Sequence, residues 1–363
     1  MKRSITSTIQ SNAVIALAYV LFPLSQMIFD PTNQAISRNW IDIAWIAIAG
    51  LASLTLRIKR DPNELTFFSL VLITSIVLLC ISFGSIFTSQ FYVLPILLDT
   101  KVIIYLIISL IISNSKFNPD RAAFCTGGVL LSAIIITEFL TRSLISGKLE
   151  RPIGSGEINY DAALILLSLI LSMSGSTSRS YYKLILLLGL ICTFSRTGLI
   201  GAILVVLLST TTSRLTKFAF LAIASISIVY SFIMRDLAIG NLAAMDRYWM
   251  WKSSYDYFTS DPLSTSLQVP GSAPLQIAVP NELSSLWQDQ ASKLQLTGVY
   301  PFHLHAFWLR LSTAWGWFVP FLVLTVMLIY AVRQKTDNES RMYLATFLVL
   351  GSTMGLLYLS NVA

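Results

Sequence analysis

Charged side chains are scarce in this sequence of 363 residues. Asp, Glu, Lys and Arg make up 12% of it, about half the share found in soluble globular domains, whereas hydrophobic residues make up 55% and the mean hydropathy is +0.71. Few charges with many aliphatic side chains exclude a disordered chain and predict a protein embedded in a lipid bilayer. In such a protein the net charge of +7 reflects orientation in the membrane, so we expect no nucleic-acid partner.

Cysteine and histidine are also rare, with three and two copies. Cys80, Cys125 and Cys192 all lie inside apolar runs, which argues against a disulfide framework and against a cysteine-bound metal. His303 and His305 are the only histidines, and the chain has neither an HExxH nor a CxxC motif. The sequence therefore predicts no metal site. It also has no internal repeat.

Long apolar runs are abundant. A helix needs about 20 mostly apolar residues to cross a bilayer, and about eleven segments qualify. They are 11–29, 40–56, 66–87, 94–113, 122–145, 161–175, 181–194, 196–210, 216–234, 314–332 and 342–360. We therefore expect an all-α polytopic membrane protein with about 11 transmembrane helices. The first segment is not expected to be a cleaved signal peptide, because it contains Pro23 and lacks a small-x-small cleavage site.

The placement of Lys and Arg predicts the orientation of these helices. With the N-terminus in the cytoplasm, every cytoplasmic turn receives at least two basic residues and the short outer loops receive very few, as the positive-inside rule requires. The chain then divides into transmembrane helices in 1–234, one large outer loop in 235–303 and two further helices in 304–363. Pores and most transporters have short loops, so the long outer loop suggests binding or chemistry on the outer face.

Aromatic residues recur at helical spacing near the start of this large loop, at positions 248, 251, 255 and 258. This spacing predicts an amphipathic helix lying along the outer interface. Its aromatic face, which includes Trp251, suits packing or lipid contact, or alternatively a sugar ring.

Several arginines stand on the outer side, where the positive-inside rule disfavours them. Arg196 lies between two apolar segments, where an ionised side chain costs a few kcal/mol unless it is paired. Arg151 lies in the outer loop before 161–175, and Arg247 opens the aromatic segment. Arginine suits a bidentate grip on phosphate or carboxylate. The alternative for each is a helix-end anchor that is paired within the protein or extends to the interface.

His303 and His305 stand just before the tenth span. Imidazole is the side chain that can take a proton from a hydroxyl near neutral pH. Their spacing would place the two rings on different helix faces, so we expect at most one of them to face a site.

Four segments resemble those of the bacterial O-antigen ligase/polymerase family of integral-membrane glycosyltransferases. They are Arg151-Pro-x-Gly154 followed by Asn159-x-x-Ala162, then Phe194-Ser-Arg-Thr-Gly198, then Arg247 with Trp251 and Asp261-Pro-Leu263, and finally His305 to Leu309 followed by Gly316. Their order, spacing and shared outer placement carry the resemblance, over roughly residues 145–330. It implies a GT-C-like fold in the bacterial inner membrane, with a periplasmic active site.

The resemblance also implies a metal-independent glycosyltransferase without a cofactor. The donor would be a polyprenyl-pyrophosphate-linked glycan and the acceptor a glycan or lipid A core, with a flippase and a chain-length regulator as partners. Guanidinium groups would meet the charge that develops on the leaving pyrophosphate, and His305 would orient or deprotonate the acceptor hydroxyl. The expected catalytic residues are His305, Arg196 and Arg247. The expected substrate-binding residues are Arg151, Asn159, Trp251, His303 and Arg310.

Two departures from the family pattern bear on the reaction. The Asn that follows the family's His is Ala306 here, and its Glu is Ala314. Their absence favours a repeat-unit polymerase over an O-antigen ligase, and both stay open.

The main alternative is a transporter or flippase for a lipid-linked or ionic solute. It depends on two charged pairs, Asp99 with Lys101 and Glu138 with Arg142, lining a path through the bilayer. The second pair could equally neutralise itself at i,i+4, and the lack of related halves disfavours this alternative. A glycosyltransferase with an acidic, metal-binding first outer loop would need more carboxylates than Asp30, the one that this loop offers.

Overall fold

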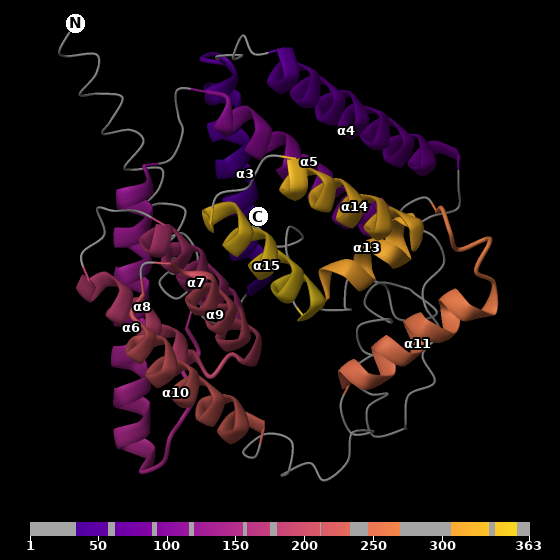
Figure 1. Ribbon diagram of the computed structural model, residues 1–363. Helices are drawn as coiled ribbons and strands as arrows, with labels where there is room; N and C mark the ends of the chain where they lie inside the picture. The colour runs from indigo at the N-terminus through magenta and orange to yellow at the C-terminus, as the bar shows by residue number, and fades with distance from the viewer. Residues whose placement is uncertain are drawn as a thin grey trace, which may run out of the picture.

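The computed structural model describes residues 34–56, 62–88, 93–115, 120–154, 158–174, 180–210, 212–232, 246–268, 306–333 and 338–353. Every regular element in these ranges is a helix and none is a strand, which confirms the all-α class (Figure 1). Within them, Arg121–Ser146 and Arg214–Ser231 are long and apolar enough to cross a membrane. The predicted span 11–29 lies outside the described residues.

Each apolar range predicted from 40–56 onward coincides with helical structure. The helices are α3 (Gln34–Ser53), α4 (Pro62–Thr88), α5 (Val93–Ser113), α6 (Arg121–Ser146), α7 (Ile158–Ser174), α8 (Ser180–Thr193), α9 (Arg196–Leu208), α10 (Arg214–Phe232), α11 (Asp246–Ser260), α13 (Phe307–Trp315), α14 (Phe318–Arg333) and α15 (Asn338–Thr353). The helix predicted from the aromatic spacing is α11.

The core is built around α7, which packs against α6, α8, α9 and α15. Ala163, Leu164, Ile165 and Leu166 of α7 are fully buried, and because consecutive residues of a helix are about 100° apart, they point to different sides of it. A helix that is apolar on all sides lies in a protein core or in lipid, and here the neighbouring helices cover α7. The first residues of α7 are therefore held rigidly, and these residues form part of the candidate site.

Small residues let the helices of this core approach closely. A Cβ added at Gly189 of α8 would come within 2.6 Å of the side chain of Ser132 on α6. A Cβ at Gly198 of α9 would lie 2.8 Å from the Cβ of Ala162 on α7. Such contacts between small residues bring helix backbones together in membranes, where apolar side chains gain little by leaving lipid.

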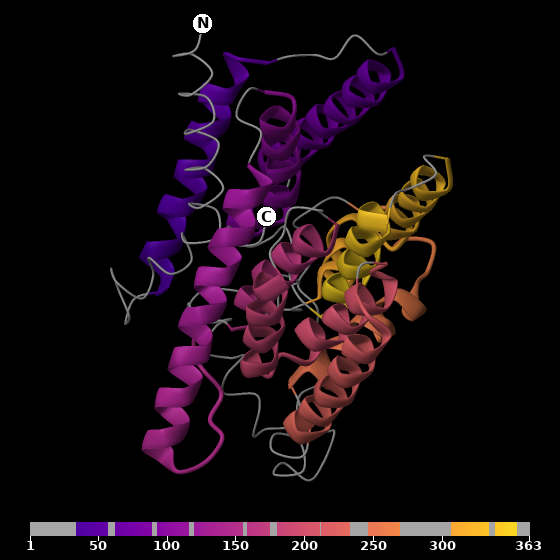
Figure 2. The same cartoon turned by 60° about the vertical axis from the view of Figure 1, so that its left-hand side comes forward.

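A second group of helices, α3, α4 and α5, lies at the edge of the molecule (Figure 2). Trp45, Ala49 and Ala52 of α3 pack against Tyr105 and Ile108 of α5. The other sides of these helices carry exposed large apolar residues.

The tenth predicted span, 314–332, is helical from Phe318 as α14, but its first residues belong to the end of α13. It is broken at Gly316, where φ is +94°, between α13 and α14. The segment 261–268, which follows α11, lies against this break: the Gln268 N–H donates to the Trp315 carbonyl at 3.0 Å, and the Trp317 N–H donates to the Thr265 carbonyl at 3.2 Å. The loop backbone replaces the hydrogen bonds that the helix loses there.

Replacing Gly316 by Ala should destabilise the protein. The positive φ disfavours any side chain, and the added Cβ would overlap the backbone of Ser266, so we expect a loss of about 1–3 kcal/mol in the free energy of unfolding. Gly50→Ala in α3 is the matched control, because nothing lies within 4 Å of its added Cβ, and it should be neutral or slightly stabilising. Thermal unfolding in detergent measures both. Equal melting temperatures for the two variants would contradict the docking of 261–268 on the α13–α14 break.

Candidate active site at the start of α9

The backbone is strained just before α9. Among the described residues, Phe194 is the one non-glycine residue with a positive φ, +49°. This conformation is an outlier for a bulky side chain and persists only where surrounding contacts enforce it. Here the Phe194 N–H donates to the Ile191 carbonyl at 3.1 Å, and the ring lies 5.7 Å from the rings of both Phe139 and Tyr230. Strain of this kind clusters at functional sites.

Asn159, in the first turn of α7, connects the outer loop to the start of α9. Its side-chain oxygen accepts hydrogen bonds from Arg151 Nη2 and from Ser195 Oγ, both at 2.9 Å. Arg151 Nε also donates to the Thr193 carbonyl at 3.1 Å, at the end of α8. Residues from the outer loop, α7 and the α8–α9 turn therefore meet at one place.

Arg196 is the first residue of α9, and its side chain is held by α10. Its Nε donates to Ser231 Oγ at 3.3 Å and its Nη2 to the Ser231 carbonyl at 3.2 Å. The Ser231 hydroxyl in turn donates to the Phe194 carbonyl at 3.4 Å. Both of these acceptors on Ser231 are neutral, and they orient the guanidinium group.

Two cationic side chains and a helix N-terminus come together at this point. Ser195 is the N-cap of α9, and its hydroxyl accepts from the Gly198 N–H at 3.3 Å. The N-terminus of a helix carries a partial positive charge and N–H groups that suit phosphate. Arg151 and Arg196, both half-buried, add two cationic groups beside it.

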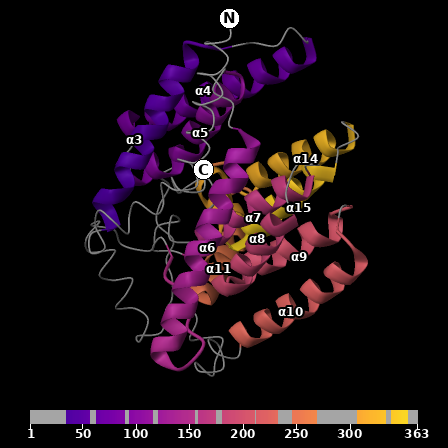
Figure 3. The same cartoon turned by 90° about the vertical axis from the view of Figure 1, so that its left-hand side faces the viewer.

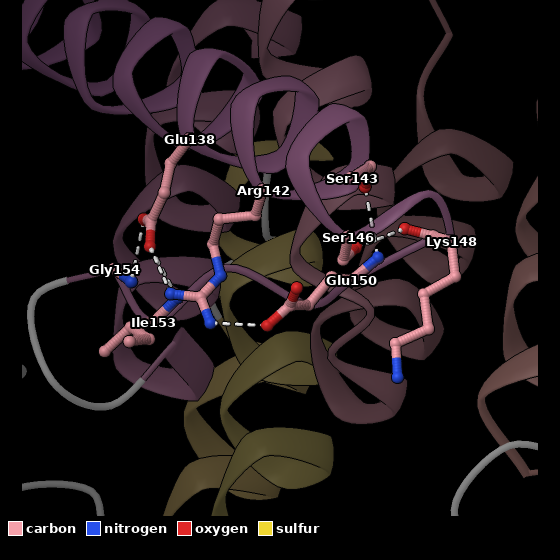
Figure 4. A network of polar contacts seen from close by, with 8 residues as sticks. All are labelled: Glu138, Arg142, Ser143, Ser146, Lys148, Glu150, Ile153 and Gly154. Atoms are coloured by element: carbon pink, nitrogen blue, oxygen red, sulfur yellow. Dashed lines mark hydrogen bonds and ion pairs between the residues drawn. The ribbon is translucent and has the colours of Figure 1, made fainter.

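The α6–α7 loop that carries Arg151 is tied back onto α6 by a charged network (Figure 4). The Glu138 carboxylate accepts from the backbone N–H of Ile153 at 2.8 Å and of Gly154 at 3.0 Å. Glu138 also forms the i,i+4 ion pair with Arg142, at 3.8 Å, and Arg142 Nη2 donates to Glu150 at 2.6 Å. The charged side chains of α6 therefore bind the loop between α6 and α7.

Stability should depend on the charge of Glu150. The hydrogen bond from Arg142 holds the pKa of the Glu150 carboxyl below its ordinary value of 4.5. A lowered pKa in the folded protein adds stability that is present above the ordinary pKa and is lost as the pH falls through the folded value. We expect a small gap in melting temperature between the protein and Glu150→Gln at pH 7 that closes toward pH 3. A gap that is independent of pH would contradict this pair.

The other predicted site residues lie in different places. Arg310 is buried in α13, with its Nε 3.2 Å from Asp99 Oδ1 on α5. Trp251 is 44% exposed on α11, which Figure 1 draws apart from α6 and α8. Arg247 belongs to the first turn of α11, with its side chain outside the described structure. His303 and His305 lie outside the described residues, directly before Ala306, the N-cap of α13.

Sequence reasoning did not assign roles to Thr193, Ser195 or Ser231. A serine before Arg196 is a typical N-cap, so the role of Ser195 was open to prediction. Ser231 lies 35 positions from Arg196, and no local pattern connects the two. Among the described residues, no three His, Cys, Asp or Glu side chains gather as metal ligands would.

Comparison of the chain with protein-family models, with curated proteins and with solved structures finds no match.

Proposed function

We propose that this protein is a polytopic protein of the bacterial inner membrane, with about eleven spans and its site on the periplasmic side. Exposed apolar side chains support membrane insertion. Leu215, Phe218 and Ile226 of α10 are 80%, 74% and 69% exposed. Only 17% of the residues from Arg214 to Ser231 are buried within the protein. Figure 3 shows α10 at the edge of the molecule. Soluble monomers rarely expose an apolar surface of this extent, and lipid would cover it.

The activity we propose is the transfer of a polyprenyl-pyrophosphate-linked glycan to a sugar acceptor, as in the O-antigen ligase/polymerase family. The observation that carries it is the junction at the start of α9. There, Arg151 and Arg196 flank a helix N-terminus, connected through Asn159 and Ser195. Two guanidinium groups and a helix N-terminus suit the two phosphate groups of such a donor. The polyprenyl tail would stay in the lipid beside the exposed apolar helices.

The reaction that fits these groups is a single displacement. The acceptor hydroxyl oxygen attacks the anomeric carbon of the donor sugar, the bond from that carbon to phosphate breaks, and the pyrophosphate leaves on its lipid. Arg151 and Arg196 stabilise the growing negative charge, with Arg247 contributed by the large loop. His305 takes the acceptor proton, a contribution typically worth about 10²–10⁴-fold.

Within this family, a repeat-unit polymerase fits better than a ligase. Ala306 caps α13 without a side-chain hydrogen bond, and Ala314 is buried in the same helix, so neither position supplies the polar group that the ligase pattern has. A flippase that delivers the donor and a chain-length regulator would be the partners of such an enzyme.

The transporter alternative has less support, because the acidic side chains it needs are engaged with other groups within the protein. Asp99 is paired with Arg310, and Glu138 holds the backbone of Ile153 and Gly154 at the end of α6. Nothing in this arrangement favours a path through the bilayer.

Complementation of a deletion strain tests the proposal. The unaltered gene should restore surface polysaccharide, whereas His305→Ala and Arg247→Ala should fail to do so at equal protein levels. Single repeat units on the lipid anchor in the deletion strain would indicate a polymerase, and long chains left on the polyprenyl carrier would indicate a ligase. Normal surface polysaccharide in the deletion strain would contradict the proposal.

A further inference from the structure

The loop that carries Arg151 is tied to α6 at several points. It leaves α6 through Gly147, whose φ is +67°, and reaches Gly154, whose φ is +63°. Between these two turns, the Glu150 N–H donates to Ser143 Oγ at 3.0 Å. The two N–H groups at its far end, those of Ile153 and Gly154, both donate to one side chain, that of Glu138.

We propose that Glu138 is a positioning residue that sets the direction of the Arg151 guanidinium group toward the donor pyrophosphate; this rests on the function proposed above. Its two carboxylate oxygens each accept one backbone N–H, at 2.8 and 3.0 Å. Charge-assisted bonds of this kind are shorter and stronger than neutral ones. Figure 4 shows the carboxylate pointing from α6 toward the backbone of Ile153 and Gly154. Ile153 is separated from Arg151 only by the buried Pro152.

Fixing the turn fixes the direction in which Arg151 leaves the loop. Gly154 packs tightly under the loop, because a Cβ added there would lie 2.9 Å from Ile158 Cδ1 and would also meet the carboxylate of Asp161. The turn is therefore pressed against the start of α7, where Asn159 accepts the Arg151 hydrogen bond. Glu138 therefore fixes the backbone next to Arg151, while Asn159 and the Thr193 carbonyl hold its guanidinium group.

Arg142 provides an internal comparison, because it contacts two carboxylates of which only one, that of Glu138, binds the backbone of Ile153 and Gly154. It lies 3.8 Å from Glu138 and 2.6 Å from Glu150. Glu138→Gln and Glu150→Gln remove the same charge from the same arginine. Only Glu138→Gln removes an acceptor from the Ile153 and Gly154 N–H groups, since an amide NH₂ cannot accept a hydrogen bond.

The test is a double-mutant cycle on the purified full-length protein in detergent, with farnesyl diphosphate as the probe and calorimetric titration as the measurement. We expect Arg151→Ala and Glu138→Gln each to weaken binding about 10-fold, the loss typical of a bond to a charged group. If Glu138 acts through Arg151, the double variant should bind no more weakly than Arg151→Ala alone. Glu150→Gln should bind like the unaltered protein.

Two results would overturn the positioning role while leaving the proposed function intact. One is unchanged affinity in Glu138→Gln when Arg151→Ala binds weakly. The other is losses that multiply in the double variant, as a general loosening of the fold would produce. Failure of the unaltered protein to bind the probe, or normal binding in both Arg151→Ala and Arg196→Ala, would instead overturn the proposed function and this inference together.

A measurement without a ligand supports the same distinction. Hydrogen exchange at the amides of Ile153 and Gly154 should accelerate in Glu138→Gln and stay unchanged in Glu150→Gln. Where Glu138→Gln does not fold, Glu138→Asp takes its place, because the shorter carboxylate can reach one N–H but not both. It should show a smaller loss of affinity with the same non-additivity. Unchanged exchange at both amides contradicts the clamp.

Discussion

Arg196→Ala should reduce the rate of glycan transfer by about 10²–10³-fold, the usual cost of removing one donor aimed at a developing oxyanion. The folded structure should survive, because Arg196 is half-buried and its bonds to Ser231 lie at the end of α10. The measurement is the initial rate at which membranes that hold equal amounts of protein extend a lipid-linked glycan.

Arg214→Ala is the matched control for this variant. Arg214 is also the first residue of a helix, the neighbouring α10, and it is exposed. It lies at the far end of the α9–α10 hairpin from Arg196, so its loss should leave the rate unchanged. Equal rates for Arg196→Ala and the unaltered protein, or equal losses in the two variants, would remove Arg196 from the site.

The second large effect concerns stability. Asp99→Asn should destabilise the protein by about 3–5 kcal/mol, because it removes the carboxylate that faces the buried Arg310 charge. Asp99 is fully buried and the side chain of Arg310 is 8% exposed, so water cannot take the place of the carboxylate. Thermal unfolding in detergent should show a markedly lower melting temperature.

Two further variants separate this effect from a general loss of charge. Asp99→Asn combined with Arg310→Met removes both charges and should recover part of the lost stability. Lys101→Met, two residues further along α5, removes a cation that lies 5.7 Å from the Tyr105 ring centroid and should cost far less. A double variant less stable than Asp99→Asn would contradict the ion pair and favour a different role for Arg310.

The helices were predictable because the signal for each is local. An apolar run of sufficient length predicts a helix whatever it packs against, and the ranges for α4, α5 and α6 agree with the structure to within a few residues. The break at Gly316 was not predictable in this way. It depends on the backbone of 261–268 lying against Trp315 and Trp317, and no pattern within 314–332 reports that contact.

The contacts of the candidate site also divide into local ones, which the sequence predicts, and long-range ones, which it does not. The contact of Arg151 with Asn159 spans eight positions and agrees with their place in one predicted outer loop. The partner of Asp99 could not be found locally, because the sequence pairs it with Lys101 whereas the structure pairs it with Arg310, 211 positions away. The exposed Trp251 shows that the aromatic spacing of α11 predicts a helix but not which face packs on the protein.

The central claim is that Arg151 and Arg196 hold a lipid-linked pyrophosphate while its glycan is transferred. The most direct test reconstitutes the purified protein in vesicles with lipid-linked glycan extracted from the deletion strain. It measures release of free polyprenyl pyrophosphate with EDTA present and no nucleotide sugar. The account predicts that release accompanies lengthening of the glycan and that Arg196→Ala abolishes both while Arg214→Ala retains them. Release that requires a divalent metal or a nucleotide sugar, or that is unchanged in Arg196→Ala, would contradict it.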